Sequence, residues 1–175
     1  EDESFKKDME SLDDFVSSYN EMSGYLTKSY ENTTEKLEEY IKRVIERYNL
    51  FVRLGSFIYL TLSTDSRNEE ALKYSDRLDV KESLMAEADA KLEAWIGNIP
   101  NIEDCIHKSE VLKEHAFILR ELAFMSKYLL SEKEEAVIAK LQNTGSNSWQ
   151  KLKDVLISNL MVDMEPEEGH RELPI

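Results

Sequence analysis

The sequence is poor in the residues that interrupt helices or cross-link a chain. Its 175 residues include five glycines, three prolines and one cysteine. So few turn-forming residues disfavour a protein built from many short strands and favour long helices. The single cysteine, Cys105, cannot form a disulfide within these residues. This fits a reducing compartment, and we expect a cytoplasmic location.

The sequence also lacks a basic stripe and a long apolar run. The net charge of −14 would repel phosphate groups, and no cluster of Lys and Arg offsets it, so we expect no nucleic-acid partner. The longest uncharged apolar stretch, residues 54–64, is much shorter than the roughly 20 residues of a membrane span. The first residues, Glu1-Asp2-Glu3, do not resemble a signal peptide. We therefore expect no membrane partner.

No residue pattern of a complete catalytic or metal site is present in the sequence. A zinc peptidase helix needs two histidines one turn apart with a glutamate beside the first. The histidines are His107, His115 and His170, and the residue one turn after His115 is Leu119, which cannot bind a metal. We interpret His115 as a packing residue, and Cys105 with His107 as too small a set for a metal site. We expect no catalytic, cofactor or metal residue, and a complete active site within this chain is the weakest hypothesis.

What the sequence has is apolar residues at steps of three and four, as on one face of a helix. The spacing predicts a first helix over 5–26 that buries the following side chains: Phe5, Met9, Leu12, Phe15, Val16, Tyr19, Met22 and Leu26. A second, long helix follows to about residue 62, and Asn32-Thr33-Thr34 supplies residues of the type that caps a helix. Polar residues 63–68 then separate it from a third helix.

The third helix is predicted to run as one piece to Gly97. Glycine at this position permits a left-handed cap, and Pro100 cannot continue a helix. Residues 98–109 are expected to form a connector with one short turn.

Three further helices are predicted after this connector. A fourth covers residues 111–131, and a fifth starts at a capping box of Ser131 and Glu134 and ends at Gly145. A sixth covers residues 148–160. The predicted fold is all-α, a compact antiparallel array of about five or six helices, followed by a short C-terminal β-hairpin fragment.

The C-terminal residues alternate apolar and polar side chains around a turn. Residues 161–164 and 173–175 flank the turn at 165–169, a pattern typical of a β-hairpin. The sequence stops as the second strand starts, and a two-stranded hairpin alone is marginal in water. We therefore expect residues 1–160 to form one helical domain, and residues 161–175 to begin a hairpin that leads into a further domain.

Some polar and aromatic residues have a functional interpretation beside a structural one. Asn32-Thr33-Thr34 matches a glycosylation acceptor, but without a signal peptide we interpret it as a helix cap. Glu134 and Glu135 point to different sides of a helix and do not form a catalytic pair. Six tyrosines suit the lining of a peptide groove, although packing in or around the core is the simpler explanation. They are Tyr25, Tyr30, Tyr40, Tyr48, Tyr59 and Tyr74.

One long stretch resembles a known family. From Leu130 to Leu152 the sequence reads Leu-Ser, acidic residues, a short amphipathic helix, Thr-Gly-Ser, and then Trp149 with a further helix. This order closely resembles oligoendopeptidase F, of the thimet-type zinc oligopeptidase family. Residues 59–65 look like the segment at the end of that family's long second helix. Lys127-Tyr128-Leu129 departs from the family pattern, in which a basic residue and a histidine precede the Leu-Ser step.

The resemblance implies the N-terminal helical domain of such a peptidase, with the catalytic domain missing from these residues. In this family the region packs on the catalytic domain and helps wall a deep channel that admits short peptides. The implied partners are therefore the chain's own catalytic domain and short peptide substrates, with zinc in the missing catalytic domain and no cofactor in this chain. The fragment can also self-associate through the face that it would normally bury. The alternative hypothesis is a stand-alone helical-bundle interaction or sensor module.

Overall fold

The computed structural model of the chain describes residues 3–164 and 171–174, and almost all of these are helical. The all-helical class predicted from the sequence is confirmed. The predicted number of helices is too low, because two of the expected helices are broken and the connector holds one more. The helices of the described residues are α1 (Glu3–Leu26), α2 (Thr33–Thr64), α3 (Glu69–Ser83), α4 (Ala86–Gly97), α5 (Ile102–Lys108), α6 (Glu110–Glu114), α7 (Ala116–Met125), the 3₁₀ helix η1 (Ser126–Tyr128), α8 (Glu132–Thr144) and α9 (Ser146–Ser158).

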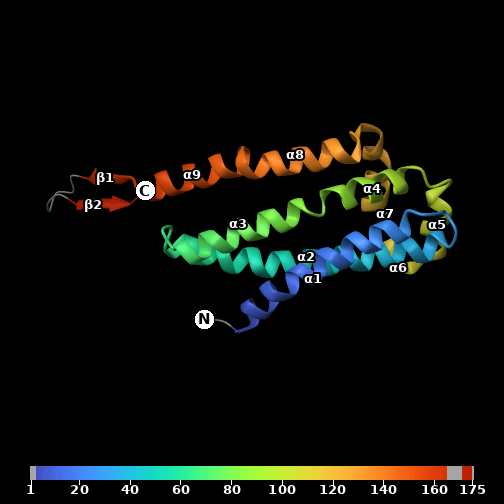
Figure 1. Ribbon diagram of the computed structural model, residues 1–175, viewed down its shortest axis with the longest axis horizontal. Coiled ribbons are helices and arrows are strands. Elements are labelled where there is room, and N and C mark those ends of the chain that lie inside the picture. The colour runs from blue at the N-terminus through green and yellow to red at the C-terminus, as the bar shows by residue number, and fades with distance from the viewer. Residues whose placement is uncertain (1–2, 165–170, 175) are drawn as a thin grey trace.

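The long helices form three layers (Figure 1). Helices α1 and α2 pack side by side, α3 and α4 lie against them, and α8 contacts both α3 and α4. The short helices α5, α6 and α7 close one end, and α9 continues α8 toward the other end. The layered arrangement leaves the outer side of α8 and α9 facing away from the rest of the chain.

Two clusters of apolar side chains form the core. Phe5, Met9 and Leu12 of α1 meet Leu50 and Leu54 of α2 in the smaller cluster, near the N-terminal end of α1. The larger cluster joins the second half of α1 and the start of α2 to α4, α5, α6 and α7. The stripe predicted for the first helix is confirmed, since seven of its eight side chains are buried and Phe15 is partly buried.

The turn between α1 and α2 is held by a buried lysine. Lys36 is 7% exposed, and its Nζ donates to the carbonyls of Leu26 at 3.1 Å and Ser29 at 2.8 Å. The first bond satisfies a carbonyl at the end of α1, and the second satisfies a carbonyl of the turn. Asn32 lies at the N-cap of α2 with φ of 52° and makes no side-chain cap bond, so its predicted capping role is wrong. Asparagine is one of the few residues that adopts this left-handed backbone readily.

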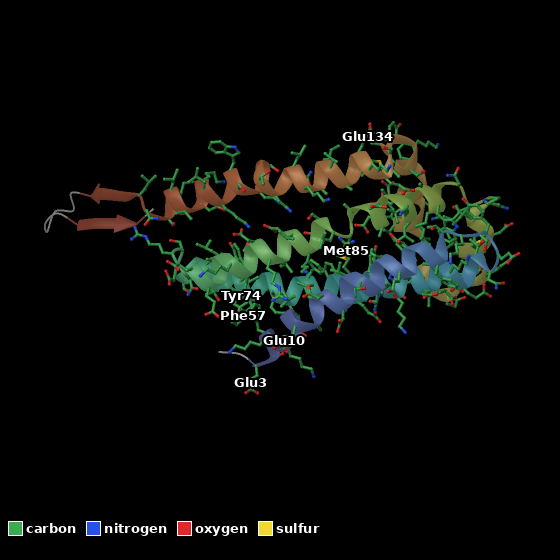
Figure 2. All side chains as sticks on the ribbon, in the orientation of Figure 1. Glu3, Glu10, Phe57, Tyr74, Met85 and Glu134 are labelled. Carbon is green, nitrogen blue, oxygen red and sulfur yellow. The ribbon has the colours of Figure 1, made fainter. Side chains whose placement is uncertain are left out.

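The predicted third helix is two helices, α3 and α4, with a break at Leu84 and Met85. Met85 is fully buried in the larger core cluster, and Figure 2 shows it between the layers. Asn20 of α1 donates its side-chain amide to the Leu84 carbonyl at 3.3 Å, which gives one of the freed backbone groups a partner. The break therefore depends on α1, a tertiary partner that local spacing does not reveal.

Two more predictions about helix ends are corrected. Gly97 is the last residue of α4, and its backbone is not left-handed. Asn98 follows as the C-cap. The expected connector contains the seven-residue helix α5, and the expected fourth helix is divided at His115 into α6 and α7. The His115 Nδ1 lies 2.9 Å from the Val111 carbonyl, so the ring closes the end of α6.

Two short strands follow α9. Strand β1 (Met161–Met164) pairs antiparallel with β2 (Arg171–Pro174), and the register places Met161 opposite Pro174 and Met164 opposite Arg171. The pair projects beyond the end of α9 (Figure 1). The turn predicted at 165–169 and His170 lie outside the described residues.

Candidate functional site on the C-terminal helices

The outer side of α8 and α9 carries a row of apolar side chains that no other described element covers. We name this row the C-terminal stripe, and its members are between 46% and 71% exposed. They are Val137, Leu141, Trp149, Leu152 and Leu156. Their spacing of four, eight, three and four residues puts them on one side of two successive helices. Neither α8 nor α9 has any buried residue.

The opposite side of the same helices faces the bundle. Its half-buried residues follow one another at intervals of four: Ala139, Asn143, Asn147, Lys151 and Val155. Residues two positions apart on a helix lie about 200° apart, so Ala139 and Leu141 point in nearly opposite directions. The exposed stripe is therefore distinct from the side of α8 and α9 that faces the bundle. It is a separate, apolar side of α8 and α9.

The start of α8 is fixed by the capping box that the sequence predicts. The Glu134 amide donates to Ser131 Oγ at 3.4 Å, and the Ser131 amide donates to a Glu134 carboxylate oxygen at 2.9 Å. The serine bonds hold the pKa of Glu134 below its usual value. Figure 2 shows Glu134 at the outer edge, where α8 begins. Glu135 accepts the Leu130 amide at 3.1 Å, so the two glutamates have separate structural roles.

Helix α8 rests on α4 through small residues and across a group of carboxylates. Ala86 and Ala90 of α4 and Ala139 of α8 line a cavity of about 170 Å³ between the two helices. Glu93 also lines it, and burial, together with the nearby charges of Asp89 and Glu135, raises the pKa of Glu93. A salt bridge of 3.5 Å between Lys91 and Glu132 links the helices at the surface.

Helix α9 is attached to α3 mainly by one lysine. Lys151 Nζ donates to Asp76 at 2.7 Å and to Asp79 at 2.5 Å. Burial alone would lower the pKa of Lys151, but the bonds to the two aspartates raise it above its usual value. Arg67, in the turn before α3, also bonds to Asn159 just after α9. The anchoring contacts are polar, whereas the opposite side of α9 is apolar.

A charged network under α4 holds this helix to the first two. Arg47 of α2 donates from Nη1 to both carboxylate oxygens of Asp89 at 2.9 Å, and the Tyr19 hydroxyl donates to Asp89 at 2.7 Å. Burial raises the pKa of Tyr19 above its usual value, and the Asp89 charge adds to this rise. Burial would lower the pKa of Arg47, but Asp89 raises it. One carboxylate thus joins α1, α2 and α4, and fixes the platform on which α8 rests.

The residues considered for catalysis or metal binding do not meet in one place. Cys105 is buried in the larger core cluster, whereas His107 is exposed on the same helix. His115 bonds to a backbone carbonyl, and His170 lies outside the described residues. Over residues 3–164 and 171–174, no three His, Cys, Asp or Glu side chains are grouped so as to hold a metal ion.

The six tyrosines do not line a single groove. Tyr40 is buried in the core, and Tyr30 stacks on Trp95 with ring centroids 5.9 Å apart. Tyr74 packs edge-on against Phe5 at 5.0 Å, at the end of the bundle where Figure 2 also shows Phe57. Tyr48 and Tyr59 are exposed on α2. Packing therefore explains Tyr30, Tyr40 and Tyr74, whereas Tyr25 is exposed as well.

The C-terminal stripe lies wholly on α8 and α9, and these two helices fall within the part of the chain that matches a known family. Residues 84–161 match the N-terminal family model described as Oligopeptidase F. This part of the chain is similar to the N-terminal domain of oligopeptidase F. The match begins at the break before α4 and ends at the first residue of β1, so it contains the whole C-terminal stripe. It also contains Leu130 to Leu152, on which the sequence resemblance depended, and that prediction is confirmed.

The oligopeptidase F match places this part of the chain in a noncatalytic N-terminal domain of a peptidase family. No curated protein and no solved structure matches the chain. Within the described residues, no helix is both long and apolar enough to cross a membrane.

The C-terminal stripe is not predicted as a surface from the sequence. Val137, Leu141, Trp149 and Leu152 are predicted only as positions on helices of a compact array. The spacing at which they occur is the signal, but spacing identifies residues that share a side of a helix and not the element that covers this side. The polar residues Asn143, Asn147 and Lys151 on the opposite side of the same helices were the sign that the apolar side need not face the bundle.

Proposed function

We propose that this chain is the noncatalytic N-terminal domain of a zinc-dependent oligoendopeptidase, and that it walls the channel through which short peptides enter. Peptide-bond hydrolysis and the zinc ion belong to a catalytic domain outside these residues. The observation that carries the proposal is the uncovered C-terminal stripe within the segment that matches oligopeptidase F. An extended apolar surface of this kind marks a protein interface.

The stripe is the face that docks on the catalytic domain in this proposal. It contains one tryptophan, Trp149, which is 71% exposed, and tryptophan is among the residues most enriched at the centre of interfaces. Lys151 and its two aspartates hold α9 on the bundle from the other side. The stripe is therefore presented by helices that are already attached, and docking does not require them to fold first.

The two longest helices supply the wall. Helix α1 has 24 residues and α2 has 32, which corresponds to roughly 36 and 48 Å at 1.5 Å per residue. Both core clusters and the Asp89 network tie these helices together along most of their length. Two long helices held together in this way form a stiff wall, which suits a channel that selects peptides by shape. A cytoplasmic location is part of the proposal, and the lone Cys105 fits it.

The test is to mix this chain with a separately produced oligoendopeptidase F catalytic domain that lacks its own N-terminal domain. We expect a one-to-one complex by size-exclusion chromatography with light scattering. The chain alone should not cleave a quenched peptide with zinc present, and the complex should cleave short peptides in preference to an unfolded protein. Failure to form any complex would overturn the proposal in favour of a stand-alone interaction module.

A pair of variants tests the docking face itself. Leu141→Glu with Leu156→Glu puts two charges on the stripe and should abolish the complex, because buried unpaired charges are costly. Lys133→Gln with Lys140→Gln changes the net charge by the same amount at exposed positions beside the stripe and should leave the complex intact. If the stripe variant binds as well as the control, the docking face lies elsewhere.

A further inference from the structure

A cleft opens between α9 and the turn that joins α2 to α3. It has a volume of about 750 Å³, which is within the range of roughly 300–1,000 Å³ typical of small-molecule sites. Leu62 of α2, Leu72 of α3 and Val155 of α9 give it an apolar floor, and each of these side chains is half-buried. The cleft lies on the bundle-facing side of α9, so it is separate from the C-terminal stripe.

Three hydroxyls around this floor have already used their hydrogen-bond donors. The hydroxyls of Ser63, Thr64 and Ser158 donate to the carbonyls of Tyr59, Thr61 and Val155 at 2.8, 2.8 and 3.0 Å. A hydroxyl that donates inward still offers its lone pairs. The rim therefore presents acceptors to a ligand, and a ligand that fits it should bring donors.

Asp154 and the paired Lys151 are the charged residues that line the cleft. Lys151 lines the cleft, but two aspartates hold its ammonium, so the trio carries a net negative charge. Asp154 also lines the cleft, and it accepts one bond of 2.8 Å from Gln150 and lies 3.5 Å from Lys153. A carboxylate has room for about four hydrogen bonds, so Asp154 keeps acceptor capacity.

We infer that this cleft binds a compact apolar molecule carrying a primary ammonium group, which is the chemistry of the amino-terminal residue of a short peptide and of a free aliphatic amine. The apolar part fills the floor formed by Leu62, Leu72 and Val155. The ammonium donates to Asp154 and to the hydroxyl oxygens of the rim. Binding here does not require the catalytic domain, so the inference is independent of the proposed docking.

The experiment follows amide shifts of the ¹⁵N-labelled chain during titration with small probes. Leucinamide and 3-methylbutylamine carry the ammonium, and N-acetyl-leucinamide has the same apolar part without it. We expect shifts at residues 62–72 and 151–158 with the two amines, in the millimolar range because so small a ligand makes few contacts. Shifts with leucinamide alone would assign the site to peptides, and similar shifts with both amines would assign it to amines generally.

Two variants connect the shifts to the cleft. Asp154→Asn should weaken leucinamide binding about tenfold, as expected for the loss of one charge-assisted hydrogen bond. Glu114→Gln removes an exposed carboxylate from α6 and should have no effect. Equal binding of the acetylated probe, or shifts confined to other residues, would overturn the inference. Because the measurement uses this chain alone, its failure leaves the docking proposal standing.

Discussion

Gly97, the last residue of α4, packs directly against Ser126, the first residue of η1. A Cβ placed on Gly97 would overlap both Oγ and Cβ of Ser126. Ser126 has little freedom to move, because its hydroxyl donates to the Ala123 carbonyl at 2.9 Å. The contact brings the end of α7 close to α4. Glycine is needed at position 97 because there is no room for a side chain, and not because of its backbone angles.

Substitution of Gly97 by alanine should destabilise the fold. Forcing a methyl group into a packed contact costs about 1–3 kcal/mol, and we expect the midpoint of urea unfolding to fall accordingly. Adding Ser126→Ala should not restore stability, because the Ser126 Cβ remains in the way. Adding Ser126→Gly should restore most of it.

Gly24 of α1 provides the control, since no atom lies within 4 Å of a Cβ placed there. Gly24→Ala should be neutral or stabilising by up to about 1 kcal/mol, because alanine loses less entropy than glycine in a helix. A Gly97→Ala variant as stable as Gly24→Ala would contradict the close contact with Ser126.

Asp89 should be among the most sensitive positions for stability. Its removal in Asp89→Ala leaves the Tyr19 hydroxyl without its acceptor, and leaves the half-buried Arg47 charge with the more distant Glu82 at 3.7 Å. We expect a loss of about 2–4 kcal/mol in the free energy of unfolding, against about 1 kcal/mol for Tyr19→Phe. The double variant Arg47→Met, Asp89→Leu should lose less than Asp89→Ala, because it leaves no unpaired charge. Urea unfolding measures all three, and a loss below about 0.5 kcal/mol for Asp89→Ala would refute the role of the network.

Two buried tyrosines give a prediction at alkaline pH. Burial, followed by the charge of Asp89, raises the pKa of both Tyr19 and Tyr40 above the ordinary value near 10. Above this pH the unfolded chain loses phenol protons that the folded chain keeps, so stability should fall as the pH rises. Absorbance at 295 nm should show two phenols that ionise only when the protein unfolds. Tyr19→Phe and Tyr40→Phe should each remove one phenol from that late step, and a fully ionised folded protein would contradict the prediction.

The first helix could be predicted well from the sequence because one stripe meets one core. From Phe5 to Leu26 an apolar residue occurs at every third or fourth position, and these side chains fill the space between α1 and its neighbours. The capping box at Ser131 was also predictable, since both of its bonds lie within four residues. A structural feature can be predicted from the sequence when the residues that determine it are close together in the chain or recur at a regular spacing.

The breaks in the helices could not be predicted in this way. The turn at Met85 depends on burial between the layers and on Asn20, which is 64 positions from Leu84 along the chain. The division at His115 depends on a ring that bonds back to Val111. Neither site has a glycine or proline, so tertiary contacts override a local preference for helix.

The candidate site was predictable in composition but not in location. The residues of the C-terminal stripe were identified as apolar helix positions, yet only the structure shows that α4 and α3 occupy the other side of α8 and α9. The cleft beside α9 was not predictable at all. It lies where Lys151 joins α9 to Asp76 and Asp79 of α3, and this lysine is 72 or more positions from both aspartates along the chain.

Lys151 should control the attachment of α9 and little else. Lys151→Met removes the bonds to Asp76 and Asp79, and it leaves these two carboxylates facing each other without a cation. Because the lysine is partly exposed, we expect global stability to change by less than about 1 kcal/mol. A local loss of about 1 kcal/mol should nevertheless speed amide hydrogen exchange in residues 147–158 about fivefold. Lys153→Met is the matched control, because Lys153 pairs only with its neighbour Asp154, at 3.5 Å. Unchanged exchange in Lys151→Met would show that α9 is held by its continuation from α8 rather than by the lysine.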